Sequence, residues 1–279
     1  MTEAEISQAV DMIDRHVAEG RAGKIAFVDP REIMTYGDLA RRTNQAGNLL
    51  ASLGIPREGR VGVLLHDTVD FPPVFWGAIK AGLVPVAINT LLTSEQYAYG
   101  LADCRARALV VSAPLLAAVQ PILGRLPELR HVIVAGGEAP AYALSLRAEL
   151  ERQPAELDAV PTSADEIAFW LYSSGSTGMP KGVRHVHTSA METARLYGQQ
   201  VLGIREDDVV YSAAKLFFAY GLGNAMSFPL SVGATTVLHP ERPTPEAVFG
   251  ILEKHQPTIF YGVPTLYAAM LAWPGGTPE

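Results

Sequence analysis

A run of small hydroxyl and glycine residues is followed closely by a single lysine and could bind an anion. The run follows an apolar stretch, 167–172, which is typical of a strand buried on both faces of a sheet. Hydroxyl groups and a flexible backbone could direct several donors toward one point. Pro180 fixes the backbone after the run, and Lys181 adds one compact positive charge. The sequence therefore predicts an anion-binding loop at 172–182 that contains Ser173, Ser174, Gly175, Ser176, Thr177 and Gly178 beside Lys181.

This loop differs from the Walker A loop, in which the lysine directly follows a glycine and precedes a serine or threonine that binds magnesium. Here Lys181 follows Pro180, and Gly182 replaces the hydroxyl residue. A strand-like segment, 183–186, stands where the helix of a Walker A loop would begin. The alternative is a flexible linker between two strands. A buried strand before the run and the Pro-Lys-Gly sequence after it favour a binding loop.

A second segment, 215–224, reads KLFFAYGLGN and combines three aromatic side chains with small residues. Flat apolar walls with space between them suit a planar ring, so this segment is a candidate pocket. The predicted substrate contacts are Phe218, Ala219, Tyr220 and Gly221. Composition alone favours a packed core cluster instead.

A third segment, 261–267, is expected to turn from a strand into a helix, with Gly262 ending the strand and Pro264 starting the helix. In open α/β folds such a turn lies at the carboxyl edge of the sheet, where ligands bind. A plain structural turn explains these residues almost as well. Gly262 and Pro264 are therefore predicted as neighbours of the pocket.

The histidines give little support for a metal site. His185 and His187 stand two residues apart, which places both on one face of a strand and suggests zinc. No further ligand cluster lies near them in the sequence, so no metal is expected there. We predict that His187 instead caps a helix beginning near Ser189 or contacts the loop at 172–182. The chain has no G-x-S-x-G motif, so the sequence gives no support for a serine hydrolase.

The elements that must position these groups alternate between short apolar runs and amphipathic segments. This order predicts an α/β fold with mostly parallel sheets and helices on both faces. We expect a first α/β subdomain at 1–160 and a second, with the loop and the pocket, at 161–279. The predicted strands are 24–28, 32–35, 61–65, 84–88, 108–112, 131–135, 167–172, 183–186, 209–213, 234–238 and 258–261. The predicted helices are 2–20, 36–53, 71–81, 94–104, 114–123, 141–152, 189–202, 245–255 and 264–271.

Composition limits the partners. The 279 residues are 48% hydrophobic and 18% charged, with a net charge of −7 and no basic block, which disfavours nucleic acid. No apolar stretch approaches the roughly 20 residues of a membrane helix, so no membrane partner is expected. Cys104 is the single cysteine, which excludes an intrachain disulfide and fits a cytoplasmic location. The acidic, polar N-terminus lacks the pattern of a signal peptide.

Taken whole, YSSGSTGMPKGV resembles the phosphate-binding signature of the adenylate-forming enzymes. FFAYGLGN is similar to the benzoate-CoA ligase version of that family's acyl-pocket motif, and GVPT resembles a family segment near the same pocket. The resemblance implies two steps. A carboxylate attacks the α-phosphate of ATP to form an acyl-adenylate and pyrophosphate, and coenzyme A then displaces AMP to form a thioester. It also implies that Ser176 and Thr177 contact phosphates, that Thr177 helps to hold Mg²⁺, and that Lys181 contacts the pyrophosphate.

The resemblance covers essentially this whole chain but only the front part of such an enzyme. The later Y-G-x-T-E and T-G-D motifs and a C-terminal domain with a catalytic lysine do not appear in it. We therefore expect the N-terminal part of a benzoate ligase, inactive alone, with an aromatic carboxylate, ATP and CoA as partners. The alternatives are a ligase for another acid, such as hydroxybenzoate or a fatty acid, and a non-catalytic fragment that binds an aromatic carboxylate. A homodimer is left open.

Overall fold

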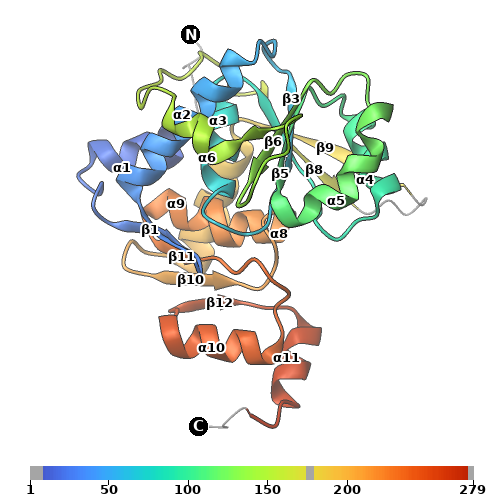
Figure 1. Ribbon diagram of the computed structural model, residues 1–279. Helices are drawn as coiled ribbons and strands as arrows, with labels where there is room; N and C mark the ends of the chain where they lie inside the picture. The colour runs from blue at the N-terminus through green and yellow to red at the C-terminus, as the bar shows by residue number, and fades with distance from the viewer. Residues whose placement is uncertain (1–8, 174–178, 276–279) are drawn as a thin grey trace.

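The computed structural model describes residues 9–173 and 179–275, and this part of the chain forms two sheets (Figure 1). The larger sheet has the order β7-β6-β5-β3-β4-β8-β9. Neighbouring strands in it run parallel, except that β8 and β9 are antiparallel. Its strands are β3 (Arg60–Leu64), β4 (Val84–Ala87), β5 (Ala108–Ser112), β6 (His131–Ala135), β7 (Leu144–Ser145), β8 (Ile167–Ser173) and β9 (Lys181–Val186).

The smaller sheet has the order β12-β10-β11-β1-β2. It is parallel apart from the antiparallel pair of β1 and β2. Its strands are β1 (Ile25–Val28), β2 (Ile33–Thr35), β10 (Val209–Ser212), β11 (Thr235–Val237) and β12 (Ile259–Tyr261). The expected α/β class with mostly parallel sheets is thus confirmed.

Helices cover the sheets in layers (Figure 1). One face of the larger sheet carries α2 (Tyr36–Ser52), α3 (Phe71–Lys80) and α6 (Leu146–Glu151), and the other carries α4 (Ser94–Asp103) and α5 (Leu116–Val119). Between the sheets lie α8 (Ala219–Leu222) and α9 (Phe228–Val232), and beyond β12 lie α10 (Pro245–His255) and α11 (Pro264–Leu271). The other helical segments are η1 (Val10–Asp14), α1 (Arg15–Ala18), η2 (Ala113–Leu115), η3 (Gln120–Arg125), α7 (Ser189–Thr193), η4 (Ala194–Leu202) and η5 (Gly223–Ser227).

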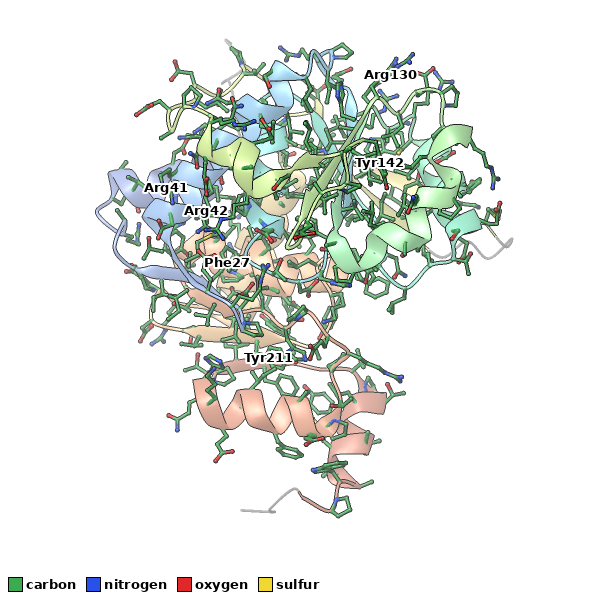
Figure 2. All side chains as sticks on the ribbon, viewed as in Figure 1. Phe27, Arg41, Arg42, Arg130, Tyr142 and Tyr211 are labelled. Carbon is green, nitrogen blue, oxygen red and sulfur yellow. The ribbon has the colours of Figure 1, made fainter. Side chains whose placement is uncertain are left out.

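The central strands are apolar on both faces because each face meets a helical layer. In β5, Ala108 and Val110 belong to the cluster shared with α2 and α3, whereas Leu109 and Val111 pack with α4 and α5. The smaller sheet is covered in the same way. Phe27 on β1 packs into the first of these clusters, and Tyr211 on β10 packs with residues of α10 and α11 (Figure 2).

Local signals explain where several helices begin. Thr93 and Gln96 form a capping box at the start of α4. The hydroxyl of Thr244 accepts the Ala247 amide at the start of α10 and caps that helix. Thr35 and Asp38 form a further capping box at α2.

Three predicted helices differ from the structure. The segment 114–123 is not one helix: it divides into η2, α5 and η3, and Pro121 inside it lacks the amide hydrogen that a continuous helix needs. The segment 141–152 contains the short edge strand β7, and α6 begins only after it, capped by Ser145. In 189–202 the α-helix gives way to a π-helix at Ala194. The first residues of the predicted helix at 2–20 lie outside the described residues.

The two sheets do not follow the division that we expected at residue 160. The strand β8 pairs with β4 in the larger sheet, although it lies after that position in the sequence. Conversely, β1 pairs with β11 and so joins the smaller sheet. Each sheet therefore draws strands from both parts of the sequence, and the subdomain boundaries remain a prediction.

Candidate functional site

A large cavity opens where the two sheets meet at the carboxyl ends of their strands. Its volume is about 1610 Å³, which exceeds the space needed for one small ligand. Residues in the loops that follow β3, β4, β5, β6, β10, β11 and β12 contribute to its lining. This is the edge at which open α/β sheets bind ligands.

The pair of β8 and β9 brings one side of the predicted phosphate loop to this cavity. Ser173 ends β8 and lies opposite Lys181, the first residue of β9. Ser173 and Pro180 line the cavity, whereas Lys181 is exposed and is not among the lining residues. The other predicted phosphate contacts, Ser174, Gly175, Ser176, Thr177 and Gly178, lie outside the described residues.

Two tyrosines attach the ends of this loop to α4. The hydroxyl of Tyr99 donates to the carbonyl of Pro180 at 3.3 Å. Tyr172 donates to the carboxylate of Asp103 at 2.6 Å and to the carbonyl of Gly100 at 3.2 Å. Burial and the bond to Asp103 raise the pKa of Tyr172, so this hydroxyl stays protonated and remains a donor. The sequence analysis did not identify these supporting contacts.

The aromatic segment forms another wall of the cavity. Phe218, Ala219 and Tyr220 line it, and the side chains of Phe218 and Tyr220 are 44% and 49% exposed. Phe217 instead belongs to the core and is 3% exposed. The centroids of the Phe217 and Phe218 rings lie 4.4 Å apart. The segment therefore divides its aromatic residues between a core contact and an open wall.

Gly221, the fourth predicted contact in this segment, is buried and does not line the cavity. A Cβ atom built there would lie 2.0 Å from the carbonyl oxygen of Lys215 and 2.5 Å from that of Ala214. The close approach of the backbone requires glycine at this position. Its contribution is to the shape of the wall.

Gly262 and Pro264 stand beside the cavity, as neighbours of the residues that line it. The carbonyl of Gly262 accepts the hydroxyl of Tyr220 at 3.4 Å, and its amide donates to the hydroxyl of Tyr267 at 3.0 Å. Pro264 begins α11, while Val263 lines the cavity.

The sequence analysis did not identify a buried carboxylate behind the aromatic wall. Asp67 follows β3, is 3% exposed and accepts the Leu216 amide with both oxygens, at 3.2 and 3.3 Å. Burial raises its pKa to about 6, against the opposing effects of Lys215 and of the Leu216 amide. Lys215 lines the cavity, and burial lowers its pKa. The sequence contained one indication of this site, which is an acidic residue shortly after a strand expected to belong to the parallel sheet.

His185 of the predicted strand 183–186 and His187 just after its end are both among the described residues. Among the described residues, no group of three or more His, Cys, Asp or Glu side chains could hold a metal ion. His185 stacks on Phe169 with 4.6 Å between the ring centroids. The predicted helix cap at His187 is wrong, because Thr188 occupies the N-cap of α7 and no side chain caps it.

Across residues 9–173 and 179–275, no helix is long and apolar enough to cross a membrane.

Comparison with known proteins confirms the family resemblance. The family model described as AMP-binding enzyme matches residues 14–278. The chain belongs to this family. It is 53% identical over 275 residues to a 4-hydroxybenzoate–CoA/benzoate–CoA ligase from Rhodopseudomonas palustris, which covers 99% of this chain and 51% of that protein. It is 55% identical over 267 residues to a benzoate–CoA ligase from Thauera aromatica, covering 95% and 50% of the two chains.

Solved structures of AMP-binding enzymes agree with the fold. An anthranilate CoA ligase, AuaEII, in complex with anthranoyl-AMP matches with a TM-score of 0.94 at 39% identity, over 97% of this chain and 52% of that one. A benzoate CoA ligase from Burkholderia xenovorans LB400 matches with a TM-score of 0.89 at 44% identity, over 96% and 52% of the chains. The chain thus spans about half the length of the relatives it matches.

Proposed function

We propose that the natural polypeptide containing this chain is an ATP-dependent aryl-CoA ligase that activates benzoate. The observation that carries the proposal is the wall of Phe218, Ala219 and Tyr220 in the same cavity as Ser173 and Pro180 of the phosphate loop. An aromatic acid on that wall would share one compartment with a nucleotide held at the loop. Identity above 50% to two ligases named for benzoate supports the same acid.

In the proposed reaction the carboxylate of benzoate attacks the α-phosphate of ATP, and pyrophosphate leaves. The thiol of coenzyme A then attacks the acyl carbon and displaces AMP. Binding both reactants in one cavity supplies the proximity that the first step needs. The ring would lie against Phe218 and Tyr220, so that its carboxylate points toward the loop.

Charge on the leaving pyrophosphate is the feature that the protein must stabilise. Lys181 stands opposite Ser173 at the end of β8 and is the proposed contact for that charge. Mg²⁺ would neutralise phosphate oxygens, and we propose Thr177 for its hydroxyl contact, with Ser174, Gly175, Ser176 and Gly178 around the phosphates. Oxygen donors suit this cation, and the exposed hydroxyl residue Ser173 fits the same donor set.

Kinetics with the full natural polypeptide would test the substrate. Benzoate, 4-hydroxybenzoate, anthranilate and hexanoate would each be assayed for pyrophosphate release and thioester formation. We expect the highest kcat/KM with benzoate. A preference for hexanoate, or no turnover of any aromatic acid, would overturn the proposal. A preference for 4-hydroxybenzoate would support the second candidate, a hydroxybenzoate ligase, because the Rhodopseudomonas relative is named for 4-hydroxybenzoate as well as benzoate.

Two further properties belong to the same proposal. A reducing compartment such as the cytoplasm suits a chain whose single cysteine, Cys104, is a buried free thiol. A homodimer is also proposed, and light scattering on the purified polypeptide would test it.

A further inference from the structure

Asp67 and Lys215 are oppositely charged, largely buried and linked to the aromatic wall through the main chain. The Asp67 carboxylate accepts the Leu216 amide, and Phe218 in turn donates its amide to the Lys215 carbonyl at 3.0 Å. The ammonium group of Lys215 donates to the carbonyl of His239 and, at 2.6 Å, to that of Glu241. These two side chains therefore connect the loop after β3, the aromatic segment and the loop after β11.

Stability alone does not explain this arrangement. Burial raises the pKa of Asp67 and lowers that of Lys215, so burial disfavours the charged form of each. Buried charges of this kind are often no more stabilising than apolar residues of similar volume. Their contacts instead go to main-chain groups of the segments that form the cavity, which is the pattern expected of groups that position a site.

The loop after β3 is itself held from the smaller sheet. The buried carboxylate of Asp29, in the turn between β1 and β2, accepts the Val69 amide at 3.1 Å. Asp29 thus holds the loop that contains Asp67, and Asp67 in turn holds the aromatic segment through the Leu216 amide. Asp29 is a matched comparison, because its carboxylate bonds to the same loop and to the neighbouring residues Arg31 and Glu32, and not to the aromatic segment.

We propose that Asp67, together with Lys215, is a positioning residue for the aromatic acid: it fixes the wall of Phe218, Ala219 and Tyr220 against which the ring binds. Asp67 contacts no reacting atom in this proposal and acts through the Leu216 amide. The proposal rests on the proposed ligase function and adds a determinant of acid binding to it.

The test compares Asp67→Ala, Asp67→Asn, Lys215→Met and the control Asp29→Asn in the full natural polypeptide. Asp67→Ala removes the acceptor of the Leu216 amide, whereas Asp67→Asn keeps one oxygen and removes the charge. We expect KM for benzoate to rise at least tenfold in Asp67→Ala and less in Asp67→Asn. KM for ATP should stay within twofold. Asp29→Asn keeps one side-chain oxygen as an acceptor and leaves the bonds between Asp67 and Leu216 in place, so it should leave KM for benzoate within twofold.

Hydrogen–deuterium exchange gives a readout that does not depend on turnover. Peptides covering 215–222 should exchange faster in Asp67→Ala than in the wild type, and at the wild-type rate in Asp29→Asn. Unchanged exchange in Asp67→Ala, or equal increases in KM for benzoate and ATP, would overturn the positioning role alone. If Asp67→Ala does not fold, Asp67→Asn and Lys215→Met decide by the same KM comparison. A wild type that uses no aromatic acid would overturn the proposed function and this proposal together.

Discussion

The two sides of the cavity are held in place by contacts of different range. At the phosphate loop, Ser173 and Lys181 are paired by strands that are neighbours in the sequence, and α4 supports their ends. At the aromatic wall, the Leu216 amide is accepted by Asp67, 149 residues away, and Tyr220 donates to Gly262, 42 residues away. The loop can be recognised within one short motif, whereas the wall depends on segments that only the fold brings together.

This difference suggests a division of roles. The loop would bind the nucleotide that every adenylating enzyme uses, so a fixed local motif suffices. The wall would bind the acid, and contacts from three other segments can adjust its position without altering the loop. Substitutions should therefore separate nucleotide effects from acid effects.

Lys181→Ala is expected to give the largest effect. Loss of the positive charge proposed to contact pyrophosphate should reduce ATP–pyrophosphate exchange by about 100-fold, or ~3 kcal/mol of transition-state stabilisation. The matched control is Arg184→Ala, because Arg184 is also exposed on β9 and lies outside the cavity lining. Equal losses in the two variants would contradict a specific role for Lys181 and weaken the contrast between loop and wall.

Gly221→Ala should damage the wall by distorting its backbone. Its Cβ would overlap the carbonyl oxygens of Lys215 and Ala214, so we expect a loss of about 3 kcal/mol in the free energy of unfolding. Gly250→Ala is the control, because Gly250 lies inside α10 with no atom within 4 Å of the added methyl group. That variant should gain about 0.5–1 kcal/mol from helix propensity. Urea unfolding midpoints measure both, and an unaffected Gly221→Ala would contradict the tight approach.

Ionisation of Asp67 should make the free energy of unfolding depend on pH. Its pKa is about 6 in the folded protein and is near 3.8 in the unfolded chain, so the folded state retains this proton over the interval between. The stabilisation from this proton is complete below pH 4 and is lost as the pH rises to about 6. Relative to Asp67→Asn, the wild type should therefore lose up to about 1.4 kcal/mol per pH unit across this interval. Urea unfolding at each pH measures this difference. If the free energies of unfolding of the wild type and of Asp67→Asn changed equally with pH, the raised pKa of Asp67 would be contradicted.

The features that could be predicted from the sequence are those fixed by local residue patterns, as at the loop. The strands around the cavity were predicted closely, because runs such as 108–112 are apolar on both faces and end at polar or turn residues. The two strands that flank the predicted phosphate loop were also expected from local residue types, although β8 extends to Ser173 and β9 already begins at Lys181. The remaining residues of the loop lie outside the described part of the chain, so their roles stay predictions.

The missed features depend on contacts between distant residues. Asp67 was not identified because its partner, the Leu216 amide, becomes its neighbour only when the two sheets meet. Gly221 was predicted as a substrate contact because its place among aromatic residues suggested open space, whereas the backbone of residues 214 and 215 occupies that space. Residue type indicates what a group could do, and packing decides which side of the wall it occupies.

Tyr99→Phe is expected to give the smallest effect, and it tests whether the loop depends on anything beyond its own motif. The variant removes only the hydroxyl that donates to the Pro180 carbonyl, and a neutral hydrogen bond of 3.3 Å contributes about 1 kcal/mol or less. KM for ATP should rise by no more than about fivefold, while KM for benzoate stays unchanged. Tyr142→Phe, at a 50% exposed side chain labelled in Figure 2, is the control and should alter neither constant. A larger rise in KM for benzoate than for ATP would contradict the division, because it would mean that α4 supports the aromatic wall through the loop.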